Sequence, residues 1–175
     1  MTVTTTTTAA TEKGSWYIVS ALVENKPGVL FRVTNLFRAR NFNIESITVG
    51  STEQQDLSRM TITTNSDERT LDQLVKQLRK LIDVVDVKVL DTERTVYREL
   101  ALIKMKAVDS TTRSEIINYA TIFRGNVLDI GKETITVEIT GTPDKIDAFK
   151  NLVEYYGIAQ LARTGVLALP RGMEI

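Results

Sequence analysis

The sequence predicts an α+β protein made of two small domains, each with the element order βαββαβ. Apolar residues alternate, or recur at helical spacing, in the same order twice along the chain. A polar segment at residues 92–98 separates the two halves. With 175 residues, 42% of them hydrophobic, each half can bury its own core. We therefore expect two split βαβ sandwiches, each with an antiparallel four-stranded sheet and both helices on one face.

Composition excludes several kinds of function. The chain has 22 basic and 22 acidic residues, so no long-range field favours nucleic acid or an anionic membrane. Cysteine and histidine are absent, which removes thiolate nucleophiles, the commonest general base and the commonest metal ligands. We predict no catalytic and no metal-binding residues. No apolar run approaches the ~20 residues of a membrane span, and we expect a cytoplasmic protein.

Residues 1–15 are expected to be a disordered leader, because this threonine-rich stretch has almost nothing apolar to bury. A transit peptide is the alternative, but such peptides are rich in arginine, and the first arginine here is Arg32.

The first half, residues 16–91, begins with an apolar strand at 16–24 and a helix at 29–40. One face of this helix carries the apolar residues, and Asn41 is expected to end it. The predicted inward residues are Val29, Leu30, Val33, Leu36 and Phe37. The helix should therefore pack on a sheet.

Two strands at 43–51 and 57–65 are predicted to form a hairpin. A second helix follows, with acidic residues in its first turn and basic residues in its last, as the helix dipole favours. Its apolar residues are Leu71, Leu74, Val75, Leu78, Leu81 and Ile82. Alternating valines at 85–90 give the fourth strand.

The second half, residues 99–175, repeats the pattern after the 92–98 linker. Strands are predicted at 101–107, 126–130, 134–140 and 158–163, and the middle two form a hairpin. Thr111 or Thr112 should cap one helix and Thr142 the other. The helices end at Gly125 and Gly157, and their inward residues are Ile116, Ala120, Phe123, Ile146, Phe149, Leu152, Val153 and Tyr156. The helix-free face of each sheet has no cover in this prediction, and unpaired edge strands favour association.

The turn at residues 24–30 is the most informative segment. The Asn25 side chain can hydrogen-bond its own backbone, Pro27 fixes its φ at about −65°, and Gly28 permits close approach of another group. A helix starts directly afterwards, so free N–H groups and a positive dipole end face this turn. Such a site suits an anion, although an ordinary connector has the same sequence features. Arg59, in the third strand, could form a salt bridge across the hairpin or reach a partner.

An RNA-recognition module has the same element order, but it stacks bases on aromatic residues of its central strands. Neither 57–65 nor 134–140 contains an aromatic residue. Walker and dinucleotide-binding fingerprints are absent too, which excludes nucleotide sites of those kinds.

Four segments carry a family resemblance: 24–30, 43–46, 57–62 and 122–125. They resemble, in sequence and order, the regulatory (small) subunit of acetolactate synthase, also called acetohydroxyacid synthase. The resemblance runs from about Trp16 to the C-terminus. It implies an N-terminal ACT domain, which senses a small molecule, and a C-terminal domain of related ferredoxin-like shape.

The resemblance also implies a function. Members of this family bind and activate the catalytic (large) subunit, which holds thiamin diphosphate, Mg²⁺ and FAD, and confer feedback inhibition by valine or another branched-chain amino acid. The effector sits in an ACT homodimer, between the turn of one protomer and the second strand of its neighbour. By motif, the implied effector contacts are Asn25, Gly28, Asn43, Val49 and Gly50.

A second reading is an ACT-containing enzyme or transcription factor that senses another amino acid. It would need a catalytic or DNA-binding domain, and the two predicted domains leave no residues for one. The chain should itself bind no cofactor.

Overall fold

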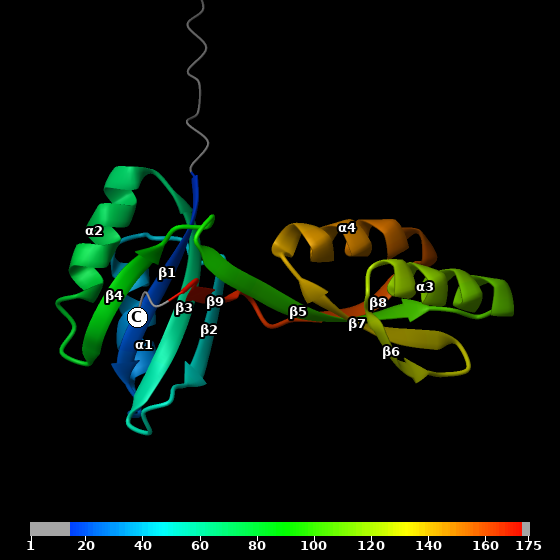
Figure 1. The fold of residues 1–175 in the computed structure, drawn as a ribbon, viewed down its shortest axis with the longest axis horizontal. Coiled ribbons are helices and arrows are strands. Elements are labelled where there is room, and N and C mark those ends of the chain that lie inside the picture. The colour runs from blue at the N-terminus through cyan, green and yellow to red at the C-terminus, as the bar shows by residue number, and fades with distance from the viewer. Residues whose placement is uncertain (1–14, 173–175) are drawn as a thin grey trace, which may run out of the picture.

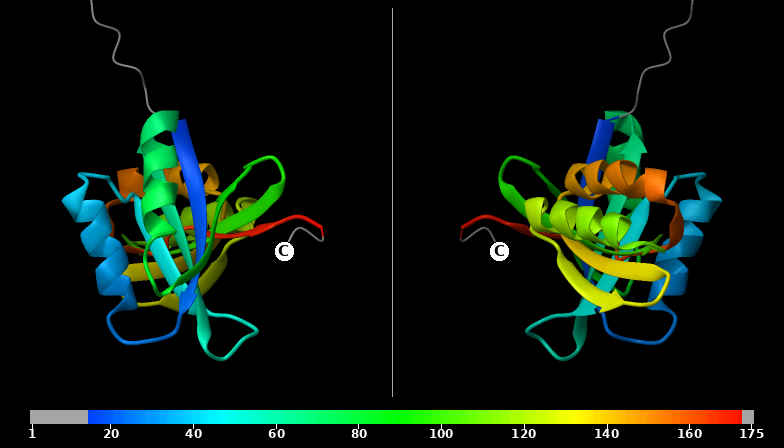
Figure 2. Two further views of the ribbon diagram at one scale, coloured as in Figure 1. Left: turned by 90° about the vertical axis from the view of Figure 1, so that its left-hand side faces the viewer. Right: turned by 90° about the vertical axis from the view of Figure 1, so that its right-hand side faces the viewer.

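The computed structural model describes residues 15–172, which form two lobes joined by a long strand (Figure 1). The predicted leader at 1–15 lies almost wholly outside the described residues. Each lobe has the predicted βαββαβ order, with its two helices on one face of an antiparallel sheet (Figures 1 and 2). The predicted α+β class and element order are confirmed.

The first lobe contains a four-stranded sheet with strand order β2-β3-β1-β4. Its elements are β1 (Ser15–Glu24), α1 (Val29–Ala39), β2 (Ser46–Ser51), β3 (Leu57–Ser66), α2 (Glu68–Leu78) and β4 (Val84–Leu90). The predicted second strand at 43–51 therefore begins at Ser46. The core lies between the sheet and the helices, and Phe37, Met60 and Leu78 are among its buried side chains.

The second lobe repeats this topology with strand order β6-β7-β5-β8. Its elements are β5 (Thr95–Lys106), α3 (Ser110–Ile122), β6 (Asn126–Ile130), β7 (Thr134–Gly141), α4 (Pro143–Val153), the 3-10 turn η1 (Glu154–Tyr156), β8 (Ile158–Arg163) and β9 (Leu167–Pro170). Phe149 fills the centre of its core, against Phe123 at 5.3 Å between ring centroids.

Strand β9 was not predicted, and it changes the reading of the segment between the domains. It pairs antiparallel with Thr95–Arg98, so part of the predicted 92–98 linker is the start of the 12-residue strand β5. Strand β9 has only four residues and ends at Pro170, so its sequence shows little alternation. Its partner strand also lies far away in the chain. The division into domains at 16–91 and 99–175 stays a prediction.

The prediction that the helix-free face of the first sheet is uncovered was wrong. A small apolar cluster joins that face to the β5–β9 ribbon, and it contains Ile18, Leu90, Val166 and Ala168. Trp16 and Tyr97 pack against the cluster, with their ring centroids 5.6 Å apart. The C-terminal segment therefore covers part of the N-terminal sheet.

One helix cap and three inward assignments differ from the predictions. Asp109, not Thr111 or Thr112, caps α3, because its carboxylate accepts the Thr112 N–H at 2.8 Å. Thr142 occupies its predicted cap position without a side-chain hydrogen bond. Ile82 is 93% exposed because α2 ends at Leu78, and helical spacing no longer directs the later side chain inward. The other exposed side chains of this set are Leu30 and Leu152, at the margins of their apolar stripes.

Adjacent residues of β9 test the role of this contact. Ala168 is 2% exposed and Leu167 is 61% exposed, because successive side chains point to opposite faces. Ala168→Asp should lower the free energy of unfolding reported by Trp16 fluorescence by at least about 2 kcal/mol, because it buries an unpaired carboxylate. Leu167→Asp, the matched control, should change it by less than about 0.5 kcal/mol. Equal urea midpoints for both variants would show that the cluster contributes nothing to stability.

Candidate functional site

The β1–α1 turn is held in place by its backbone. The Asn25 N–H donates to the Asp56 carbonyl at 2.7 Å, and the Glu24 N–H donates to the Asp83 carbonyl at 2.9 Å. The turn is thereby fixed to two loops, one before β3 and one before β4. The side chain of Asn25 is exposed and makes no hydrogen bond within residues 15–172.

Gly28 occupies a left-handed conformation, with φ 87° and ψ −9°, directly before α1. Glycine adopts this region without the steric penalty that a Cβ brings. Its carbonyl accepts the Arg32 N–H at 3.0 Å, the first helical bond. Within the described chain, the N–H groups of Leu30 and Phe31 have no acceptor, as is normal in a first helical turn. The turn therefore exposes donors at the positive end of the helix dipole.

Arg32 adds a positive charge beside this turn, and the sequence did not suggest that role. Its Nε and Nη2 donate to the two carboxylate oxygens of Asp83 at 2.6 and 2.8 Å. Its Nη1 lies 3.6 Å from the position that a Cβ on Gly28 would occupy. Helical spacing puts Arg32 opposite the apolar stripe of α1, and it cannot show that the side chain folds back over the N-terminus of its own helix. A buried Asp83 partner, 51 residues away, gives no local signal.

Strand β2 carries the second group of predicted contacts. Val49 and Gly50 pair with Met60 and Arg59 of β3, and no strand among the described residues lies beside the outer edge of β2. Both residues are exposed. β2 lies two strands from β1, or about 10 Å across the sheet.

Asn43 lies apart from the other four predicted residues. It follows the C-terminal end of α1, an 11-residue helix of about 16 Å, whereas Asn25 and Gly28 precede it. Its carbonyl accepts the Thr64 hydroxyl at 2.7 Å, and its side chain is exposed. One chain therefore does not bring all five predicted residues into one pocket.

Arg59 lies on the helix-free face of the first sheet. Its Nη1 donates to the Ser20 hydroxyl at 3.1 Å, and the salt bridge considered from sequence is not formed with any described residue. Around it is a hollow of about 480 Å³, also lined by Leu22, Lys88 and Leu169.

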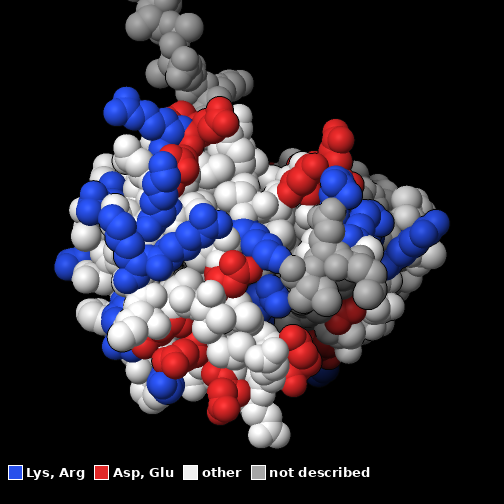
Figure 3. Space-filling model, turned by 60° about the vertical axis from the view of Figure 1, so that its left-hand side comes forward, with Lys and Arg blue, Asp and Glu red and all other residues white. Residues whose placement is uncertain are grey.

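Surface charge is unevenly distributed although the formal net charge is zero. On the face drawn in Figure 3, Lys and Arg side chains form a band, and Asp and Glu side chains gather above and below it. Opposite charges this close partly cancel beyond a Debye length of about 8–10 Å. The band is a local feature.

The described residues contain no group of three or more acidic side chains that could hold a metal ion. Asp67 and Asp109 are helix caps, and the hydrogen bonds that their carboxylates accept from Thr70 and Thr112 lower the pKa of both side chains. The hydrogen bond to Glu115 raises the pKa of Tyr156, which keeps this phenol protonated. Between residues 15 and 172, no helix is long and apolar enough to cross a membrane.

Comparison with known proteins gives the family. Residues 19–86 match the AHAS small subunit-like ACT domain, and residues 98–172 match the family described as the small subunit of acetolactate synthase. The chain is 53% identical to the probable acetolactate synthase small subunit of Methanothermobacter thermautotrophicus, over 89% of this chain and 93% of that one. It is 48% identical to the small subunit of Mycolicibacterium smegmatis, over 89% and 91%.

The crystal structure of the acetolactate synthase small subunit from Thermotoga maritima has the same fold. It superposes with a TM-score of 0.84 at 43% identity, and the match covers 90% of this chain and 98% of that one. The chain belongs to the family of regulatory small subunits of acetolactate synthase, with an ACT domain in its N-terminal half.

Proposed function

We propose that the chain binds and activates the catalytic subunit of acetolactate synthase and makes it sensitive to feedback inhibition by valine or another branched-chain amino acid. In this proposal the chain is cytoplasmic and has no catalytic residues of its own. Thiamin diphosphate, Mg²⁺ and FAD belong to the catalytic partner. Sensing of a different amino acid is the alternative that the same ACT fold allows.

The observation that carries the proposal is the left-handed Gly28 at the start of α1. It leaves the Leu30 and Phe31 N–H groups without an acceptor in the described chain, and the Arg32 guanidinium lies beside Gly28. Donors at a helix N-terminus suit the carboxylate of a free amino acid. Asp83 largely neutralises the Arg32 charge, but Arg32 Nη1 has no acceptor among the described residues and can donate as well. The Asn25 side-chain carbonyl can accept from the ammonium group.

The edge of β2 supports a dimeric site. Its sequence, residues 46–51, contains no charged side chain, whereas the opposite edge strand β4 carries Asp86 and Lys88. Charges on an edge strand discourage pairing, so β2 is the edge better suited to a second copy. Pairing there would bring β2 of one protomer near the β1–α1 turn of the other. The five effector positions, including Asn43, Val49 and Gly50, would then be completed across the dimer.

Reconstitution tests the function as a whole. The purified chain with thiamin diphosphate, Mg²⁺ and FAD should form no acetolactate from pyruvate, because it has no histidine or cysteine and its described residues contain no group that could hold a metal ion. Added to the catalytic subunit, it should raise the rate, and L-valine should lower the rate again. Turnover that follows the isolated chain through purification would overturn the regulatory assignment.

Gly28→Asp should weaken inhibition by valine. The carboxylate would repel the effector carboxylate and compete for the same N–H groups, so the valine concentration for half-inhibition should rise roughly ten- to a hundredfold. Space is available, since the nearest atom to a Cβ would be Arg32 Nη1 at 3.6 Å.

The control for this variant is Gly28→Asn, because any Cβ at φ 87° costs about 1–2 kcal/mol of backbone strain. Asn has nearly the same shape and the same tolerance for this conformation but no charge. Activation should survive in both variants, and the inhibition curve should shift further for Asp than for Asn. Overlapping curves for the Asp variant and the parent would mean that the turn is only a connector.

The dimer edge can be tested with two matched valines. Val49 on β2 is 46% exposed and Val85 on β4 is 58% exposed. Val49→Lys should raise the dimer dissociation constant at least about tenfold in sedimentation experiments, because like charges would meet across the new sheet. Val85→Lys should leave it unchanged. The opposite pattern would place the dimer at β4.

A further inference from the structure

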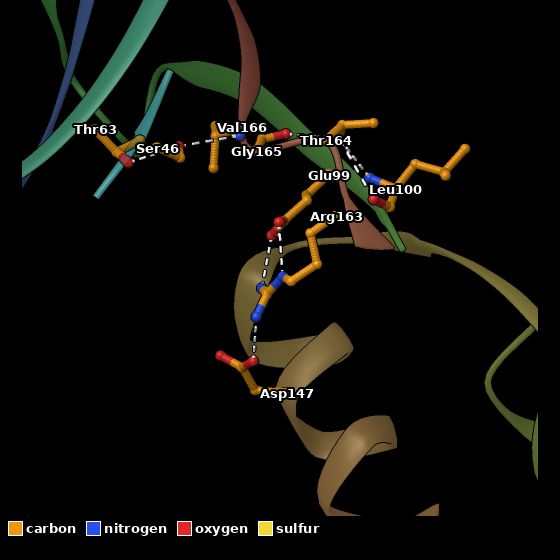
Figure 4. A network of polar contacts seen from close by, with 9 residues as sticks. All are labelled: Ser46, Thr63, Glu99, Leu100, Asp147, Arg163, Thr164, Gly165 and Val166. Atoms are coloured by element: carbon orange, nitrogen blue, oxygen red, sulfur yellow. Dashed lines mark hydrogen bonds and ion pairs between the residues drawn. The ribbon is translucent and has the colours of Figure 1, made fainter. Parts of the chain in front are cut away.

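Four consecutive residues of the C-terminal segment, 163–166, contact both lobes (Figure 4). They run from the last residue of β8 in the second lobe to the residue before β9, which packs on the first lobe. These contacts are separate from the five proposed effector positions.

Toward the first lobe, the segment is held by two hydroxyls of β2. Thr48 Oγ1 donates to the Val166 carbonyl at 2.6 Å, and the Val166 N–H donates to Ser46 Oγ at 3.3 Å. Ser46 Oγ is also 2.7 Å from Thr63 Oγ1 of β3. Ser46 and Thr48 are two residues apart on a strand, so both side chains point to the same, helix-free face. Together they bind both polar backbone groups of one residue.

Toward the second lobe, hydrogen bonds also hold the two residues before Gly165, which are Arg163 and Thr164. The Thr164 N–H donates to the Leu100 carbonyl at 3.0 Å, and Thr164 Oγ1 accepts the Leu100 N–H at 3.1 Å. Arg163 donates to both carboxylate oxygens of the buried Glu99 at 2.7 Å, and to Asp147 of α4 at 2.7 Å. Paired charge-assisted bonds of this kind fix orientation as well as distance.

The short connection between these two sets of contacts leaves little room for movement. Gly165 has φ +83°, and a Cβ there would lie 3.0 Å from Ser46 Cβ. Val166 is buried in the apolar cluster with Ile18 and Leu90. A shift of β2 that breaks the Thr48 bond would leave a buried carbonyl without a donor, which costs about 1–3 kcal/mol.

We propose that this clasp, defined as Ser46 and Thr48 of β2 bound to Val166, transmits effector binding from the ACT domain to the C-terminal lobe. The proposal rests on the proposed function, since Val49 and Gly50 lie on the same short strand as the clasp. Binding that displaces β2 must either move residues 163–166, and with them Arg163 and α4, or break the clasp. Ser46 and Thr48 are thus positioning residues for regulation and do not touch the effector.

The test uses the full chain with the catalytic subunit. The double variant Ser46→Ala with Thr48→Val removes both hydroxyls and nearly preserves side-chain volume. Thr61→Val is the matched control: Thr61 pairs with Thr48 in the neighbouring strand, it is buried, and its hydroxyl has no partner in the described chain. Thr48→Ser, which keeps the hydroxyl, is the rescue variant.

Two quantities are measured for each protein: the dissociation constant for L-valine by calorimetry on the full chain, and the ratio of reconstituted activity without and with saturating L-valine. In the double variant the dissociation constant should stay within about threefold of the parent, while the activity ratio falls at least about fivefold, the low end of typical allosteric coupling. Thr61→Val and Thr48→Ser should match the parent in both. Valine should also change amide exchange of residues 167–169 in the parent but not in the double variant.

A double variant that is inhibited as strongly as the parent would overturn the proposal, since the clasp would then only join the lobes. A parallel loss of affinity would overturn it too, because the hydroxyls would then shape the site itself. A parent chain that neither binds nor responds to valine refutes the proposed function before any variant is compared. Loss of inhibition confined to the double variant is the result that only the clasp predicts.

Discussion

The pairing of β9 with the first four residues of β5 is the interaction on which the arrangement of the two lobes depends. It makes one continuous strand serve both lobes: Glu99–Lys106 pairs with β7 in the second sheet, and Thr95–Arg98 lies with β9 over the first. Because Ala168 and Val166 then cover Ile18 and Leu90, the C-terminal segment becomes part of a second apolar cluster on the helix-free face of the first sheet. The lobes are therefore coupled by backbone pairing and apolar burial together, not by a flexible tether.

This arrangement gives the regulatory function a physical basis. In the proposed function, the ACT domain supplies a helix N-terminus for the effector carboxylate and an edge strand for pairing with a second copy. The C-terminal segment adds contacts from that same edge strand, through Ser46 and Thr48, to Arg163 and α4. A ligand can shift an equilibrium only through differential contacts with its two states. β2 is where the proposed effector site and these contacts meet.

The sequence predicted the features that depend on local pattern. Alternation and helical spacing identified both βαββαβ units, and Gly28 was recognised as a turn glycine at a helix start. The missed features that shape the two lobes involve distant residues. β9 is defined by a partner about 70 positions away, Asp83 is recruited by Arg32 from another loop, and the cover over Ile18 comes from Val166. The five effector positions came from family resemblance, and the fold explains why one chain cannot assemble them: α1 separates Asn43 from Gly28.

A structure of the dimeric full chain crystallised with L-valine tests the central claim most directly. We predict that the valine carboxylate accepts hydrogen bonds from the Leu30 and Phe31 N–H groups of one protomer, with the valine side chain against strand β2 of its partner. Valine bound within a single lobe, away from Gly28, or in the cavity of about 500 Å³ between the lobes beside Arg163, would contradict it.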